Sequence, residues 1–168
     1  MSQNGFFSDR DMAFAKVLMD GNIVLTRIFL QKGVSPNELL PFIDGRKETC
    51  FYPPLMVAVI RQNLAMVDLL LKHGASPNLS SDTGMTPLMV AADLNNHEIM
   101  KRLVFKGASI FKTEDNFGMT ASDFAKDEEA LYILMQAGLE ECGIPKAKAH
   151  SLLFGREIEN LQKQKVRE

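Results

Sequence analysis

The chain has few cysteines, few histidines and almost no net charge. Its two cysteines, Cys50 and Cys142, stand far apart among 168 residues, with no C-x-x-C pair and no histidine cluster beside them. This usage argues against a disulfide framework and against a zinc site. Nineteen basic residues against twenty-one acidic ones give a formal charge of -2, so no overall positive field attracts nucleic acid or anionic lipid. We expect neither nucleic acid nor a membrane as partner.

Long apolar runs and an export signal are also missing. The longest apolar stretches, such as Pro53 to Ile60, are much shorter than the roughly 18 residues of a membrane-spanning helix. The first residues lack a basic start followed by an apolar core and a cleavage site, so we expect no Sec export and a cytoplasmic protein. Translocation into a host cell by another route stays open as the alternative. The length of 168 residues allows one domain and a short appendage.

The sequence repeats itself at a fixed spacing. Gly74 and Gly107 each end a similar stretch, and Pro54 and Pro87 open two further similar stretches. The two spacings are equal, since 107 minus 74 and 87 minus 54 give the same number. Two independent landmarks therefore agree on one period of about 33 residues, a length typical of solenoid proteins.

Related segments on both sides extend the pattern to four units, at about 8–37, 48–78, 81–111 and 115–140. The first connection, from Gly33 to Gly74, is longer than the period, which indicates an insertion at about 38–47. This insertion either lengthens a loop toward a partner or folds back over the first unit. We expect residues 1–143 to form one repeat domain and residues 144–168 to form a C-terminal helical extension.

Each unit has the pattern of two short helices and a loop. In the third unit, Thr86 suits the N-cap and Pro87 the first position of a helix that ends before Asn95. A second helix is expected over about 97–106, closed by a left-handed Gly107. The second unit repeats this over 54–60 and 64–73. In the fourth unit we expect the second helix to be shortened and to end near Gly138.

The third unit carries the most specific motifs. Gly84 to Ala92 (GMTPLMVAA) and Leu103 to Ser109 (LVFKGAS) resemble the G-x-T-P-L-H-x-A-A and L-L-x-x-G-A signatures of the ankyrin repeat family. The resemblance implies an all-α repeat solenoid of stacked helix-turn-helix repeats with hairpin loops. Met56 and Met89 replace the histidine of the family pattern, so its Thr–His hydrogen bonds are absent and the interfaces must rely more on packing. We expect these methionines to fill the core.

Little in the sequence supports catalysis. Each of the three histidines has a plainer role: His73 precedes the helix-ending Gly74, His97 opens a helix at a solvent-exposed position, and His150 lies in the tail. No P-loop, dinucleotide-binding or H-E-x-x-H motif occurs. We therefore expect no enzyme, no cofactor and no metal.

Function is then expected from the surface. In ankyrin repeat proteins, the face of the first helices and the loops usually binds a protein partner. Carrying over the partner-facing positions, several of them apolar, predicts a hydrophobic groove with Asp20, Arg61, Asp82 and Asp93 at its polar rim. The alternative is that some of these side chains pack under the insertion or the tail. The predicted binding residues are Met19, Asp20, Thr49, Cys50, Tyr52, Ile60, Arg61, Asp82, Thr83, Met85, Asp93, Leu94, Asn116, Phe117 and Met119.

The leading functional prediction is a non-catalytic adaptor that binds a protein through this face. A secreted bacterial or viral effector acting on a host protein, or an inhibitor or immunity-type binder, is the alternative; a small enzyme has the least support. We expect a monomer. Leu152, Leu153 and Ile158 of the tail either cap the last repeat or mediate self-association.

Overall fold

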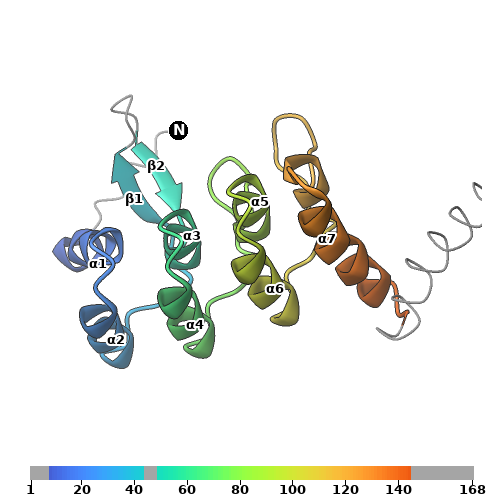
Figure 1. The fold of residues 1–168 in the computed structure, drawn as a ribbon. Helices are drawn as coiled ribbons and strands as arrows, with labels where there is room; N and C mark the ends of the chain where they lie inside the picture. The colour runs from blue at the N-terminus through green and yellow to red at the C-terminus, as the bar shows by residue number, and fades with distance from the viewer. Residues whose placement is uncertain (1–7, 44–48, 145–168) are drawn as a thin grey trace, which may run out of the picture.

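A computed structural model describes residues 8–43 and 49–144. Helix pairs stack side by side in chain order, as the sequence predicts for an ankyrin solenoid (Figure 1). The first helices of the four pairs form one row and the second helices another. The elements are α1 (Asp9–Met19), α2 (Ile23–Gln31), β1 (Leu40–Ile43), β2 (Thr49–Tyr52), α3 (Pro54–Ile60), α4 (Leu64–Lys72), α5 (Pro87–Asp93), α6 (His97–Phe105), the 3-10 turn η1 (Ala121–Phe124) and α7 (Glu128–Glu141).

The second helices begin at asparagine in three consecutive repeats. Asn22, Asn63 and Asn96 are the N-caps of α2, α4 and α6, and each side-chain oxygen accepts a backbone N–H three residues on, at 3.0 to 3.1 Å. This bond satisfies one of the donors that a helix start leaves free. The preceding residue is left-handed each time, with φ of 69° at Gly21, 51° at Gln62 and 53° at Asn95. The left-handed residue turns the chain back, so the two helices of each pair lie antiparallel.

The predicted helix limits of the second and third repeats agree with the structure to within a residue. Thr86 caps α5 as expected, and its hydroxyl accepts the N–H of Met89 at 3.2 Å. The Sδ atom of Met89 accepts the Thr86 N–H at 3.3 Å, so the thioether completes the cap at the place of the family's histidine. The second helices end before Gly74 and Gly107, whose φ values are 86° and 84°.

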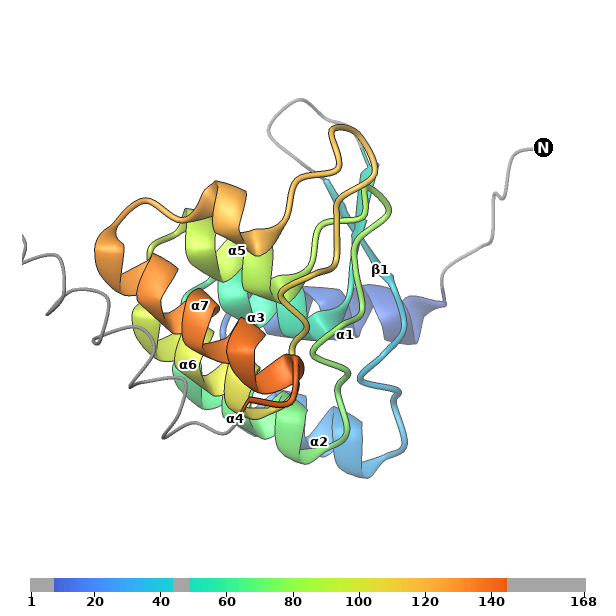
Figure 2. The same cartoon turned by 90° about the vertical axis from the view of Figure 1, so that its right-hand side faces the viewer.

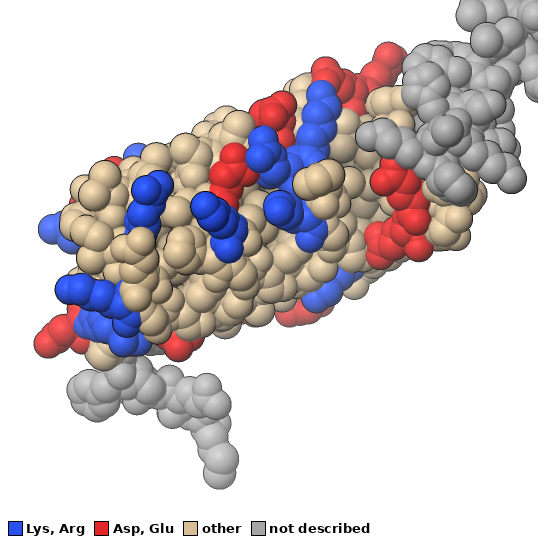
Figure 3. All heavy atoms as spheres, turned by 90° about the horizontal axis from the view of Figure 1, so that it is seen from below, with Lys and Arg blue, Asp and Glu red and all other residues tan. Residues whose placement is uncertain are grey.

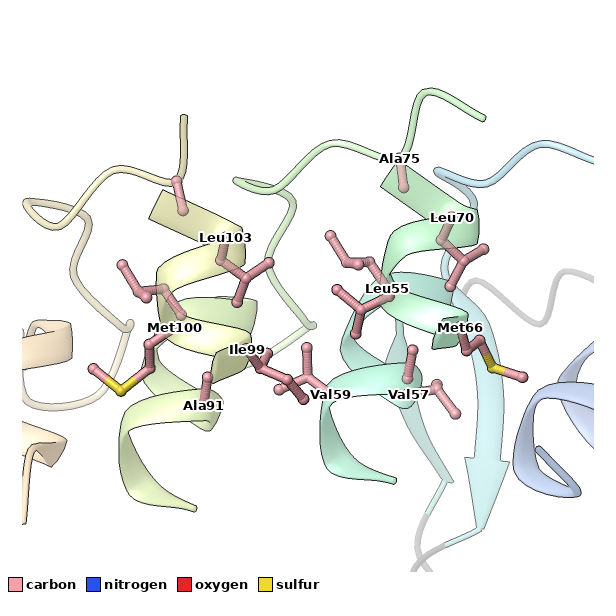
Figure 4. Packing of buried hydrophobic residues seen from close by; sticks show 14 of the residues in the cluster. Leu55, Val57, Val59, Met66, Leu70, Ala75, Ala91, Ile99, Met100 and Leu103 are labelled. Carbon is pink, nitrogen blue, oxygen red and sulfur yellow. The ribbon is translucent and has the colours of Figure 1, made fainter. Parts of the chain in front are cut away.

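The core runs along the stack between the two rows of helices. Figure 4 shows side chains of α3, α4, α5 and α6 pointing toward one another across the boundary between the second and third repeats. Met56, Met66, Met89 and Met100 are all fully buried, which confirms that methionine fills the core here. A flexible thioether suits such irregular space between repeats.

The fourth repeat differs from the sequence prediction. Its second helix is not shortened: α7 has 14 residues and is the longest helix that the structure describes, while the first helix is reduced to the four-residue η1. Gly138 lies inside α7, where an added Cβ would come 2.5 Å from Cδ1 of Ile110. This glycine allows close packing, and the left-handed glycine that follows the helix is Gly143, with φ of 82°.

The insertion forms half of a hairpin. β1 pairs antiparallel with β2, with Leu40 opposite Tyr52 at the base. Leu40 is 1% exposed and β1 contacts α1, so the insertion both extends the hairpin and packs on the first repeat. Residues 44–48 and the predicted C-terminal extension from residue 145 onward lie outside the described residues.

Candidate protein-binding surface

The ends of the first helices form one row across all four repeats. Viewed along the stack, the first helices and the loops between repeats lie on one side, and the second helices on the other (Figure 2). Met19, Ile60, Asp93 and Lys126 occupy equivalent positions in successive repeats. The last three follow one another at the repeat period, and Met19 precedes Ile60 by the period and the insertion. We call this row, with the residue that follows each of its members, the first-helix face.

The row itself is apolar in the first two repeats and charged in the last two. Met19 is 43% exposed and Ile60 is 40% exposed, and they stand on α1 and α3, which contact each other. In the third and fourth repeats the same positions hold an ion pair, with Nζ of Lys126 3.0 Å from Oδ1 of Asp93. Lys126 was not among the predicted residues, although it follows Asp93 by one repeat period.

The residues that directly follow Met19 and Ile60 in the sequence are polar. Asp20 and Arg61, the C-caps of α1 and α3, are both exposed, as the predicted polar rim requires. Leu94, the C-cap of α5, is half-buried.

Several predicted apolar binding residues contribute to the core instead of standing free. Tyr52 is half-buried and packs against the core, and its ring contacts that of Phe42 of the insertion in a tilted arrangement, with ring centroids 5.8 Å apart. Met85 is half-buried and also packs against the core. Cys50, another predicted binding residue, lies half-buried in β2, next to the exposed Thr49. The position of Tyr52 thus agrees with the alternative that some predicted side chains pack under the insertion.

The third and fourth loops bring the remaining predicted residues together. Asp82 and Thr83 are exposed in one loop, Asn116 and Phe117 in the next, and Met119 is half-buried. Asp82 is bound to β2, since its Oδ2 accepts the N–H of Phe51 at 3.2 Å. The two loops are joined by a hydrogen bond from the N–H of Asp115 to the carbonyl oxygen of Thr83, at 3.2 Å.

Sequence reasoning missed a polar cluster between the third and fourth repeats. His97 was expected at an exposed helix start, yet it is 24% exposed, with Nε2 3.0 Å from Oδ1 of Asp127. Nδ1 of His97 lies 3.4 Å from Glu129, and Asn95 donates to Asp127 at 2.7 Å. The pKa of Asp127 is lowered, first because the carboxylate accepts the Ala130 N–H at the start of α7, then because Asn95 and His97 bond to it. These contacts hold the fourth repeat against the third.

Charge is unevenly distributed over the molecule. Lys and Arg side chains gather on the face seen from below, over the second helices (Figure 3). With their C-caps, α2, α4 and α6 contain six basic residues and two acidic ones. The acidic residues therefore predominate elsewhere, although the formal net charge is only -2.

Metal-binding clusters and membrane-spanning helices are both absent from the described part of the chain. In residues 8–43 and 49–144, no three His, Cys, Asp or Glu side chains are placed to share a metal ion. The same ranges contain no helix with the length and hydropathy to cross a bilayer.

Comparison with known proteins decides the family. A family model described as three copies of ankyrin repeats matches residues 11–114. The chain belongs to the ankyrin repeat family. Ankyrin repeats are generally protein–protein interaction modules, and the family is generally non-enzymatic.

Several ankyrin proteins are similar to this chain. An ankyrin repeat-containing protein of Treponema pallidum is 29% identical over 139 residues, which are 67% of this chain and 46% of that protein. Human transient receptor potential cation channel subfamily A member 1 is 36% identical over 92 residues, 53% of this chain and 8% of the channel subunit. The chain thus spans less than half the length of these relatives. The ankyrin repeat domain of Bcl-3 has the same fold, with a TM-score of 0.65 at 24% identity over 73% of this chain and 50% of that one.

Proposed function

We propose that this ankyrin repeat chain is a non-catalytic module that binds a protein partner through the first-helix face and the adjacent loops. The observation that carries the proposal is the exposed apolar pair Met19 and Ile60. Apolar side chains that neighbour each other on a surface favour association, because their burial removes them from water.

Polar residues border this pair on the same face. Asp20 and Arg61 follow Met19 and Ile60 directly and are exposed. An apolar centre with charged residues at its edge is the usual composition of a protein interface. Further along the row, Asp93 and Lys126 neutralise each other, so they contribute shape and hydrogen-bonding groups more than net charge.

The test compares partner recovery by three forms of the full chain. Wild type, the double variant Met19→Ser with Ile60→Ser, and the control Val24→Ser serve as baits in lysate of the source cells. Val24 is 69% exposed and lies on α2, a helix that carries none of the residues of the first-helix face. We expect the double variant to recover about tenfold less of a specific partner than either other bait.

Stability must be measured beside recovery. Surface substitutions of this kind change the free energy of unfolding by about 0.5 kcal/mol each, so the three forms should melt within a few degrees of one another. Equal recovery of the same proteins by all three baits would show that the first-helix face is not the binding site. Substitution of Tyr52 is avoided, since its ring contact with Phe42 couples binding to stability.

A further inference from the structure

The most exposed apolar group stands at the tip of the fourth loop. We call residues 113–119 the fourth finger. The Phe117 side chain is 85% exposed, the largest fraction among the large apolar side chains that the structure describes. Burial of such a ring removes a large apolar area from water and therefore favours binding. Within the chain this gain is unused, so the ring is available to an apolar site on another molecule.

A buried carboxylate holds the fourth finger in one conformation. Glu114 is only 5% exposed. Its two oxygens accept the backbone N–H groups of Asn116 at 2.7 Å, Phe117 at 2.5 Å and Met119 at 3.2 Å. The Glu114 N–H in turn donates to the carbonyl oxygen of Met119 at 2.9 Å. The backbone that carries Phe117 is therefore fixed before any partner arrives.

The preceding loop supports the fourth finger. The Asp115 N–H donates to Thr83, and Gly84 packs so tightly that an added Cβ would lie 2.6 Å from Oδ1 of Asp115. An anchor on two loops that are already joined loses little conformational freedom on binding. Less of the interaction energy is then consumed by ordering the loop.

The surroundings of Phe117 are acidic. Residues 80–85 and 113–123 contain four carboxylates, Asp82, Glu114, Asp115 and Asp123, and no lysine or arginine. The exposed Lys112, just before the fourth finger, donates from Nζ to the carbonyl oxygen of Asn78 at 3.0 Å, so the carboxylates still outnumber the bases around the finger. The pKa of Glu114 is lowered chiefly by the Asn116 N–H, and that of Asp123 by the Thr120 N–H, so both stay ionised at neutral pH. The basic side chains over the second helices face another direction (Figure 3). Phe117 is thus an apolar ring in a negative local field.

We propose that the fourth finger is an anchor that inserts the Phe117 ring into an apolar pocket with a basic rim on the protein partner. The inference rests on the proposed function and adds to it the residue that enters the partner and the chemistry of the site that receives it. An aromatic anchor in a desolvated pocket carries a large share of the binding energy in many interfaces. The carboxylates around it raise the association rate with a positively charged rim.

The experiment first identifies the partner by contact and then measures affinity with purified proteins. A benzophenone amino acid replaces Phe117 in one full-length chain and Phe105 in another, and each is irradiated in lysate of the source cells. Phe105 is a matched control, because it is 81% exposed but stands at the end of α6. The protein crosslinked through position 117 is purified, and its binding to wild type, Phe117→Ser and Phe105→Ser is measured at about 20 mM and about 300 mM salt.

We expect Phe117→Ser to weaken binding about 30-fold or more, and Phe105→Ser to change it less than about twofold. Association should slow roughly tenfold at the higher salt concentration. Unchanged affinity of Phe117→Ser overturns the anchor, and if Met19→Ser with Ile60→Ser still abolishes binding, the proposed function stands without it. An association rate independent of salt overturns the basic rim. Failure of the wild-type chain to bind any protein overturns both proposals.

Discussion

Asn78 bridges the second and third repeats by binding both sides of the Gly107 turn. Its Nδ2 donates to the carbonyl oxygen of Gly107 at 2.8 Å, and its Oδ1 accepts the Ser109 N–H at 2.7 Å. Asn37 makes the same pair of bonds to Gly74 and Ser76 one repeat earlier, at 2.9 and 2.7 Å. A side-chain amide, with one donor group and one acceptor, thus links neighbouring repeats at both of these boundaries.

Replacing Asn78 by Ala should destabilise the chain by about 1–3 kcal/mol, since two hydrogen bonds are lost and the turn's backbone groups lose their partners. Chemical denaturation followed by circular dichroism measures the change. Asn116→Ala is the matched control, because the Asn116 side chain is exposed at a loop tip and only its backbone N–H is bound. If both variants unfold at the same denaturant concentration as wild type, the bridge contributes nothing to stability.

Gly84→Ala should be much more destabilising than Gly74→Ala. Both glycines are left-handed, with φ of 78° and 86°, which costs an alanine about 1 kcal/mol. At Gly74 an added Cβ has free space, whereas at Gly84 it would lie 2.7 Å from the backbone nitrogen of Asp115. The backbone must therefore move, and we expect a loss of roughly 3 kcal/mol for Gly84→Ala. Equal midpoints of thermal unfolding for the two variants would contradict this close packing of the loops.

The repeat period allowed the fold to be predicted, because each landmark has a local physical cause. Thr86 and Pro87 specify a helix start by themselves, and Gly107 specifies a helix end through its positive φ. Gly138 failed as a landmark because a glycine can also serve packing. The contact that requires a glycine there is with Ile110, which lies before η1 and α7 in the chain, so a local pattern does not reveal it.

The candidate surface was predictable only in part, since periodicity places a residue on a face without saying what covers it. Met19, Ile60 and Phe117 are exposed as expected. The Tyr52 ring packs against Phe42, a residue of the insertion, which has no counterpart in the repeat pattern. Glu114 was missed because its role depends on three backbone donors of the loop that follows it.

Met89→Ala should cost about 2–5 kcal/mol, the range for removing a large buried side chain. Met89 is fully buried, and its sulfur also accepts the Thr86 N–H. Met135→Ala provides the control, because Met135 is 53% exposed on α7. The free energy of unfolding from urea titration distinguishes the two. A comparably small loss of unfolding free energy in both variants would mean that neighbouring side chains fill the space left by Met89 at little cost.

Protonation of Glu114 at low pH should loosen the fourth finger, and this requires no change in any other repeat. The pKa of Glu114 lies below its usual value of 4.5, because the Asn116, Phe117 and Met119 N–H groups stabilise the carboxylate more than burial disfavours it. A folded-state pKa below the unfolded one means that the stabilisation is complete above the unfolded value and is lost as the pH falls through the folded value. The amide resonances of these three residues should therefore shift together below pH 4.5, as followed by NMR.

Glu114→Gln provides the decisive comparison. The amide side chain cannot ionise and presents only one acceptor oxygen, so it can satisfy few of the three N–H groups. We expect faster hydrogen exchange at Phe117 and Met119 in this variant at neutral pH, with unchanged exchange in α4. The acid-dependent shift should disappear, because the group that titrates has been removed. If the wild-type shift persists in Glu114→Gln, the titrating group is another carboxylate, and Asp123, whose pKa is also lowered, would be the next to replace.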